Sequence, residues 1–176
     1  MTNLNSIKSM VEADLLISFF DLTNFVKISG ERTAPEMFGM LSEFYELAGK
    51  ITEAAGGKIV KFIGDAGLAI FPDAMADNGV LALRDLKIKA EEFFARRKVS
   101  TRLIVKIHFG SAAIGPLGVS GDKRTDVIGE SVNTAATLAS KGFAISPQAF
   151  RKLSAETRKL FRKHTPPVVY ILSDQD

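Results

Sequence analysis

Apolar and polar residues recur with two different periods along this chain, and these periods predict where strands and helices lie. Short apolar runs and alternations typical of strands occupy six segments: 14–22, 58–63, 68–71, 103–114, 143–146 and 168–172. Apolar residues at helical spacing predict four helices: from Pro35 to a stop at Gly56-Gly57, 78–97, 130–140 and 147–163. The glycine-rich stretch 115–124 is expected to form a turn or a long hairpin.

The order of these elements predicts one α/β (α+β) domain that spans residues 1–176. Strands and helices follow one another without a linker or an internal repeat, and their order favours a mostly antiparallel sheet with helices packed on one face. This is a ferredoxin-like or palm-like arrangement. Pro166 and Pro167 precede the last strand, which is therefore expected at an edge of the sheet.

Composition and charge are those of an ordinary globular protein and exclude several kinds of site. Hydrophobic residues make up 46% and charged residues 24%, and cysteine is absent, which excludes disulfides, thiolate metal sites and a cysteine nucleophile. The net charge of +3 does not argue for nucleic acid, although it would favour a polyphosphate. The apolar run 15–20 is too short to span a membrane, and the first residues do not resemble a signal peptide. A soluble cytoplasmic domain is expected.

Two aspartates follow apolar runs that should be buried. Asp21 ends the run SFFD, and Asp65 ends the run KFIGD in the first predicted hairpin. A buried carboxylate without a partner is costly, and a divalent cation is the simplest shared partner for two of them. Oxygen ligands of this kind hold Mg²⁺ or Mn²⁺, and a pair of such ions suits phosphoryl or nucleotidyl chemistry. Taken singly, each aspartate could instead be a turn or cap residue.

Four strings resemble the class III nucleotidyl cyclase catalytic domain in their order and spacing. They are FDLTNF at 20–25, GKIVKFIGD at 57–65, IHFG at 107–110 and DVIGESVNTAA at 126–136. The resemblance covers about residues 14–154, the expected core of the domain, and implies the class III cyclase fold. It also implies an adenylate cyclase, a lyase of cAMP signal transduction that converts ATP to 3′,5′-cyclic AMP and pyrophosphate. Any regulatory domain or protein would lie outside these residues.

The resemblance further implies a role for each matching residue. The metal ligands for two Mg²⁺ or Mn²⁺ ions would be Asp21, Asp65 and the backbone carbonyl of Leu22. The phosphate loop would be Thr23, Asn24 and Phe25. A head-to-tail homodimer would place these groups of one chain opposite the residues of its partner that read the base and the ribose.

Lys61 and Asp126 match the family positions that select the base. A lysine can donate to adenine N1 and a carboxylate can accept from the N6 amino group, whereas guanine would set donor against donor and acceptor against acceptor. The pair therefore favours ATP over GTP. An ion pair of Lys61 with Asp126 or with Asp65 is an alternative in the empty protein, and it does not exclude this role.

Asn133 matches the asparagine that orients the ribose, but the chain departs from the family one turn later. Thr137 stands where the family carries an arginine that stabilises charge on the α-phosphate, and losing such a contact costs about 3 kcal/mol of transition-state stabilisation. In the phosphate loop, Asn24 and Val26 replace the usual glycine and threonine. These departures predict a slow enzyme.

Two other functions compete with this one. The first is a catalytically degenerate module of the same fold that binds nucleotide or dimerises, which Thr137 favours. The second is another two-metal enzyme such as a diguanylate cyclase, whose Gly-Gly-(Asp/Glu)-Glu-Phe signature is absent because Lys58 follows Gly56-Gly57. We therefore expect the adenylate cyclase, with the degenerate module as the alternative.

Overall fold

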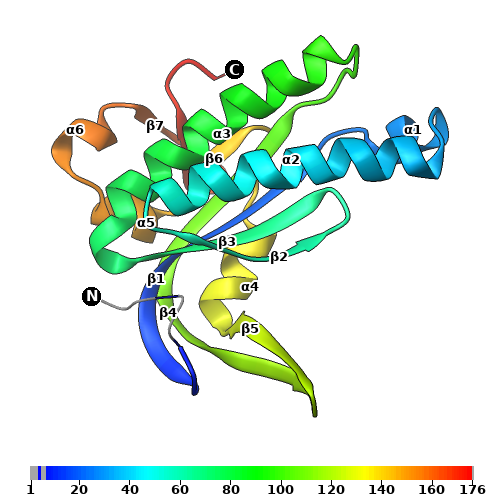
Figure 1. Ribbon diagram of the computed structural model, residues 1–176. Coiled ribbons are helices and arrows are strands. Elements are labelled where there is room, and N and C mark those ends of the chain that lie inside the picture. The colour runs from blue at the N-terminus through cyan, green and yellow to red at the C-terminus, as the bar shows by residue number, and fades with distance from the viewer. Residues whose placement is uncertain (1–3, 5–6, 176) are drawn as a thin grey trace.

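In the computed structural model, which describes residue 4 and residues 7–175, two long strands form the centre of one sheet (Figure 1). β1 (Val11–Leu22) pairs antiparallel with β4 (Leu103–Val119) along its whole length. The other strands are β2 (Lys58–Ile63), β3 (Ala66–Pro72), β5 (Asp122–Ile128), β6 (Phe143–Ile145), β7 (Phe161–His164) and β8 (Val169–Leu172). Their order is β2-β3-β1-β4-β6-β8-β7, with β5 paired to the far part of β4. Of the described pairings, only β4 with β6 is parallel, which confirms a mostly antiparallel sheet.

Six helices and one short 3₁₀ turn are described. They are α1 (Phe25–Gly30), α2 (Ala34–Ala54), the turn η1 (Asp73–Met75), α3 (Ala76–Arg96), α4 (Glu130–Thr137), α5 (Pro147–Lys152) and α6 (Ala155–Arg158). α2 begins with a capping box, in which Thr33 and Glu36 satisfy each other's backbone amides next to Pro35. None of the described helices is long and apolar enough to cross a membrane.

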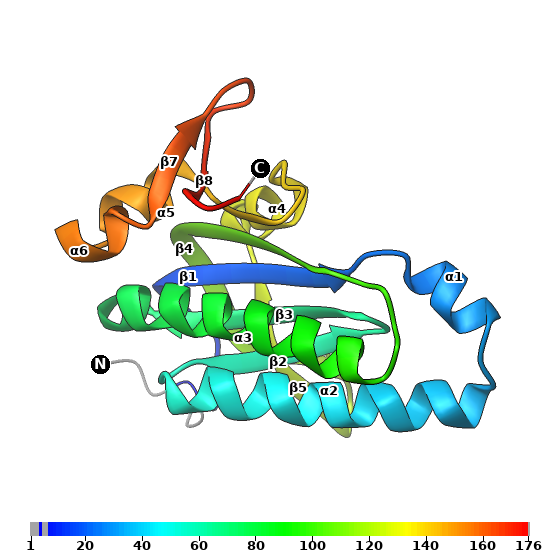
Figure 2. The same cartoon turned by 90° about the horizontal axis from the view of Figure 1, so that it is seen from above.

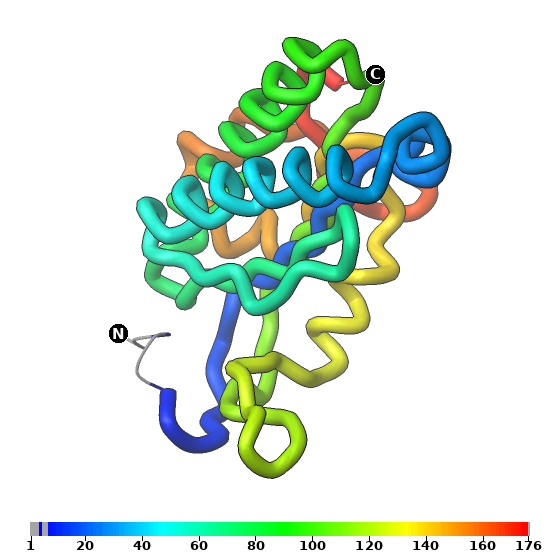
Figure 3. Tube along the Cα trace, turned by 45° about the vertical axis from the view of Figure 1, so that its right-hand side comes forward, coloured from blue at the N-terminus to red at the C-terminus, as the bar shows by residue number. Residues whose placement is uncertain are grey.

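Helices cover both faces of the sheet, whereas the sequence pattern predicts helices on one face. Side chains of a strand alternate between faces, so Leu16 and Phe20 join the core beneath α2 and α3 while Leu15 and Ile17 face the other way. α4 covers that second face with buried Val132. α2 and α3 lie side by side on the first face (Figure 1). The β4–β5 arm, residues 115–128, confirms the expected long hairpin and extends beyond the body of the sheet (Figure 3).

The predicted helix over 147–163 is wrong. α5 stops at Leu153, which is extended, and the Ser154 side chain accepts a hydrogen bond from the Thr157 amide and starts α6. Phe161 is buried and begins β7, a strand that local helical spacing conceals. The expected edge position of the last strand is also wrong, because β7 pairs with β8 and takes the edge itself. These elements lie at the end of the molecule away from α1 (Figure 2).

Candidate functional site

The ends of β1 and of the β2–β3 hairpin bring the two predicted metal ligands together. Phe20 pairs with Gly67, so Asp21 and Asp65 lie at the same end of the sheet. The Leu22 amide donates a hydrogen bond of 3.2 Å to Asp65 Oδ2. Burial, and to a smaller extent the charge of Asp21, raises the pKa of Asp65 even though hydrogen bonds from its own amide and that of Leu22 act in the opposite direction. Asp21, Leu22 and Asp65 therefore form one acidic group at the end of β1.

This acidic group fits a divalent cation. Asp21 Oδ1 is buried and has no hydrogen-bond partner among the described residues. A buried carboxylate oxygen without a partner is stabilised by a nearby positive charge. The described part of the chain contains no group of three or more His, Cys, Asp or Glu side chains that could hold a metal. Two carboxylates with the rest of the shell left to carbonyl oxygen, water and phosphate are the ligands that Mg²⁺ uses at phosphate sites.

Tyr45 of α2 holds the hairpin that carries Asp65. Its hydroxyl donates a hydrogen bond to the Gly64 carbonyl, and its ring stacks on Phe62 at 3.7 Å with planes 4° apart. Gly67 is required in this hairpin because a Cβ there would lie 2.2 Å from the Phe20 ring. The sequence alone does not reveal this role of Tyr45, since its place among the apolar residues of α2 marks it only as part of a helix face.

Lys61 and Asp126 form an ion pair within one chain, one of the alternatives that the sequence leaves open. Lys61 Nζ lies 2.9 Å from Asp126 Oδ1 and 2.7 Å from Oδ2, between β2 and β5. A shift of register between Ile59 and Lys61 turns the lysine out of its apolar run, so its side chain is 42% exposed. The Val127 amide also donates to Asp126 Oδ1 at 2.8 Å. The pair is accessible and its geometry is set by two strands.

Asn133 and Thr137 lie on one exposed face of α4. They are one helical turn apart, and both are exposed while Val132 and Ala135 are buried against the sheet. The Thr137 hydroxyl donates a hydrogen bond of 2.8 Å to the Asn133 carbonyl. Because this bond uses its one proton, Thr137 offers no donor to a phosphate in this conformation. α4 ends here, three residues before the predicted end at Ser140.

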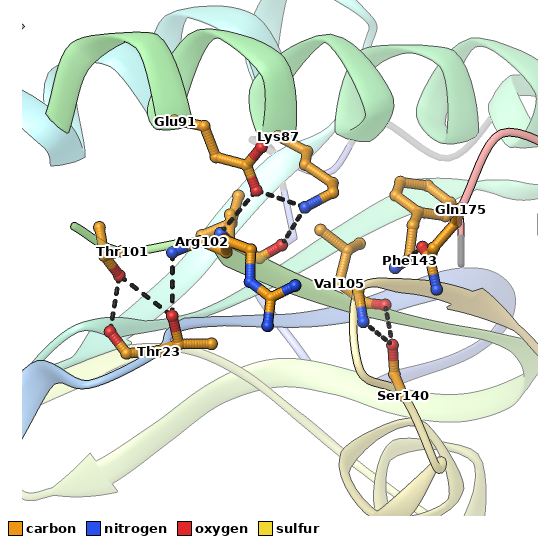
Figure 4. Close-up of polar contacts among 11 residues, drawn as sticks. Thr23, Lys87, Glu91, Thr101, Arg102, Val105, Ser140, Phe143 and Gln175 are labelled. Atoms are coloured by element: carbon orange, nitrogen blue, oxygen red, sulfur yellow. Dashed lines mark hydrogen bonds and ion pairs between the residues drawn. The ribbon is translucent and has the colours of Figure 1, made fainter. Parts of the chain in front are cut away.

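Two side chains of the predicted phosphate loop, those of Thr23 and Phe25, contact other parts of the protein. The Thr23 hydroxyl accepts from the Arg102 amide at 2.9 Å, and Thr101 donates to the Thr23 carbonyl at 2.6 Å (Figure 4). Phe25 packs against the core. Asn24 adopts the left-handed conformation at φ 61° and makes no side-chain cap, which explains why glycine suits this position. What the loop can offer a phosphate is the free amides in the first turn of α1.

The IHFG string serves packing between β4 and its neighbours. A Cβ at Gly110 would lie 2.4 Å from Ser131 Oγ of α4, so glycine lets the helix approach the strand. His108 is buried, its Nδ1 lies 2.9 Å from Ser146 Oγ, and burial lowers its pKa. Gly110 thus allows α4 to pack on β4, and His108 links β4 to the N-cap of α5.

Apart from the phosphate loop, the predicted site residues fall into three groups, namely the acidic group, the Lys61–Asp126 pair and the exposed face of α4. No described hydrogen bond or ion pair joins one of these groups to another. A further cation, Lys106 of β4, lines a cavity with Asp21. The sequence alone does not single out Lys106, because its alternating strand pattern does not reveal which residue of the neighbouring strand lies opposite.

Comparison with known proteins identifies the family. The sequence model of the family described as the adenylate and guanylate cyclase catalytic domain matches residues 8–164 of this chain. An adenylate cyclase of Anabaena cylindrica is 28% identical over 132 residues, which are 70% of this chain and 26% of that protein.

Solved structures share the fold of this chain. The adenylyl cyclase CyaB of P. aeruginosa has a TM-score of 0.82 at 18% identity, covering 95% of this chain and 97% of that one. The catalytic core of a rhodopsin-guanylyl cyclase with converted specificity, in complex with ATPαS, has a TM-score of 0.76 at 25% identity, covering 88% and 87%. The chain belongs to the family of adenylate and guanylate cyclase catalytic domains.

Proposed function

We propose that this domain is an adenylate cyclase that converts ATP to 3′,5′-cyclic AMP and pyrophosphate. The observation that carries the proposal is the acidic group, in which two carboxylates lie together and one buried oxygen of Asp21 lacks a hydrogen-bond partner in the part of the chain that the structure describes. Asp21, Asp65 and the Leu22 carbonyl would hold two Mg²⁺ or Mn²⁺ ions. When bound, such ions activate an attacking hydroxyl and neutralise phosphate charge.

Adenine is the base that the Lys61–Asp126 pair fits best. The lysine can donate to N1 while the carboxylate accepts from the N6 amino group, and guanine would reverse both contacts. A base would have to compete with the ion pair, which is partly exposed and therefore contributes little stability to be lost. The relative with converted specificity was solved with an ATP analogue, which supports an adenine nucleotide in this fold.

A head-to-tail homodimer would assemble the three groups into complete sites. No described hydrogen bond or ion pair joins these groups within one chain, so we expect a second chain to bring its Lys61–Asp126 pair and its α4 face to the acidic group. Large apolar side chains are exposed on the β2–β3 hairpin and on the β4–β5 arm, namely Ile63, Leu117, Val119 and Ile128. Their burial would stabilise such a dimer.

A catalytically degenerate module that binds nucleotide or dimerises is the second candidate. Thr137 favours it, because its hydroxyl is already bonded to the Asn133 carbonyl. We weigh the enzyme above this module since the acidic group and the Lys61–Asp126 pair are both complete.

Incubation of the purified domain with Mn²⁺ and ATP tests the proposal, with formation of cyclic AMP as the expected result. The Asp21→Ala variant is the negative control, and GTP is the competing substrate. GTP should bind more weakly, because each mismatched polar contact costs about 1–3 kcal/mol. Absence of cyclic AMP from folded wild-type protein would favour the degenerate module, and a preference for GTP would remove the base-reading role of Lys61 and Asp126.

A further inference from the structure

A cavity on the α4 side of the sheet places a lysine beside Asp21. The cavity, of about 120 Å³, is lined by Phe19, Phe20, Asp21, Ala66, Lys106 and Ala136. In the register of β1 and β4, Asp21 lies opposite Ile104 and Phe19 lies opposite Lys106. Lys106 is therefore a diagonal neighbour of Asp21 on the same face, at a separation of about 7–8 Å that long side chains can span.

Among the described residues, the ammonium group of Lys106 has only a neutral partner. Its Nζ donates a hydrogen bond of 3.2 Å to the carbonyl of Ala136, in the last turn of α4. No carboxylate in the described part of the chain lies within ion-pair distance of it. A partly buried cation gains more from an anion than from a carbonyl, so this bond can be exchanged for one to a phosphate.

A second cation, Arg102, immediately precedes β4. Its amide donates a hydrogen bond to the Thr23 hydroxyl, two residues after Asp21, so it lies near the end of β1. Figure 4 shows its side chain pointing away from α3, which covers the opposite face. Lys106 in β4 and Arg102 just before it thus add positive charge near the end of β1, which favours a polyphosphate at the acidic group.

We propose that Lys106 binds a phosphate oxygen of the nucleotide in the site formed by Asp21 of the same chain, and that it releases the Ala136 carbonyl when it does so. This inference rests on the proposed function. Because the charge comes from β4, it does not depend on position 137 of α4, where threonine carries none. Lys106 thereby supplies a cation to a site that lacks the arginine.

Two substitutions separate the charge of Lys106 from its hydrogen bond. Lys106→Gln keeps an N–H donor for the Ala136 carbonyl and removes the charge, whereas Lys106→Arg keeps the charge. Lys89→Gln is the matched control, because Lys89 is exposed on α3 on the opposite face and pairs with Asp85. Melting temperatures show whether each variant is folded.

Calorimetry with Mn²⁺ provides the test, using two probes: 3′-deoxy-ATP, which cannot cyclise, and inorganic tripolyphosphate. We expect Lys106→Gln to weaken the affinity for each probe by about tenfold, as for the loss of one charge-assisted hydrogen bond. Lys106→Arg and Lys89→Gln should leave the affinities for both probes unchanged. Unchanged affinities in Lys106→Gln, or no binding of tripolyphosphate by wild-type protein, would overturn the inference. If wild-type protein forms no cyclic AMP but Lys106→Gln shows the expected tenfold loss of affinity, the proposed enzymatic activity is wrong and the phosphate-binding role of Lys106 is still supported.

Mixing of variant chains separates this role from mere support of α4. In the proposed dimer, a Lys106→Gln chain mixed with a Lys61→Ala chain should recover one intact site, because Lys106 acts with Asp21 of its own chain. A mixture of Lys106→Gln with Asp21→Ala should not recover cyclic AMP formation. Recovery in the second mixture and not in the first would place Lys106 with α4 of the partner's site and overturn the inference.

Discussion

Asp21 and Asp65 place two carboxylates at one end of the sheet, and this arrangement disfavours the ionised form of Asp65. Burial and the charge of Asp21 raise its pKa above the ordinary value of 3.8. The ionised group therefore opposes folding at neutral pH: the stability that Asp65 contributes is present below its unfolded pKa and is lost as the pH rises through the folded value. A bound cation would reverse this penalty.

The Asp65→Asn variant should therefore melt at a higher temperature than wild-type protein in metal-free buffer at pH 7. It should also lose the stabilisation by Mn²⁺, which for one site is about 2.7 kcal/mol at a concentration of 100 times the dissociation constant. Thermal unfolding with and without Mn²⁺ measures both effects. An equal Mn²⁺-induced rise in the two proteins would show that the acidic group does not bind the metal.

Thr137 should be the residue that limits turnover. Thr137→Arg is expected to raise kcat by roughly a hundredfold, the effect of about 3 kcal/mol of charge stabilisation, with little change in the KM for ATP. The exposed position on α4 accommodates a long side chain, and arginine favours helix. Steady-state kinetics with Mn²⁺ and ATP test this, and a lower rate in a folded variant would contradict it.

Helix ends join the elements around the site. At the end of α3, the Val99 amide donates to the Phe94 carbonyl and the Lys98 amide to the Ala95 carbonyl, which is a Schellman motif. It requires a left-handed residue, and Lys98 takes that conformation at φ 57°. At the start of the same helix, Asp77 accepts hydrogen bonds from Ser154, which joins α3 to α6.

Replacing Lys98 by glycine should stabilise the domain. A lysine in the left-handed conformation is strained by about 1–2 kcal/mol, and glycine removes this strain. The greater conformational entropy of glycine in the unfolded chain opposes this gain by about 0.4–1 kcal/mol. We expect a net gain of about 0.5 kcal/mol in the free energy of unfolding by urea denaturation. Lys98→Ala is the control and should show no such gain, because alanine keeps the Cβ.

The contribution of Asp77 to stability should depend on pH. Burial raises its pKa, but hydrogen bonds from Thr157 and Ser154 and the charge of Arg158 outweigh burial and hold the pKa below 3.8. The contribution is thus present above the unfolded pKa and lost as the pH falls through the folded value. Asp77→Asn should cost about 1 kcal/mol at pH 7, and this difference should shrink below pH 3.8 in urea denaturation. A constant difference from pH 7 to pH 3 would contradict this account.

Across the whole molecule, the three groups of site residues lie on different elements, and no described hydrogen bond or ion pair joins them within one chain. This arrangement leads to a prediction for the proposed dimer. A mixture of Asp21→Ala and Lys61→Ala chains should form cyclic AMP although neither variant does so alone, because one of the two sites in the mixed dimer is intact. Activity of the mixture after subunit exchange is the measurement. No recovery from active wild-type components would mean that sites are not shared.

Local sequence determined much of this protein. The alternating strands and the α2 and α3 helices follow from periodicity, and the family follows from four strings that include Asp21, Asp65, Lys61 and Asp126. Such features depend on residues close together in the chain. Local spacing therefore suffices to predict them.

Only the tertiary structure decided which residues meet. β7 replaced a predicted helix because Phe161 gains a buried place beside β8, which outweighs local helical spacing. The roles of Tyr45 and Lys106 depend on the stacking of α2 on the hairpin and on the register between β1 and β4. Register and packing are set by contacts between distant segments, so the hairpin support and the cation beside Asp21 became visible only in the folded chain.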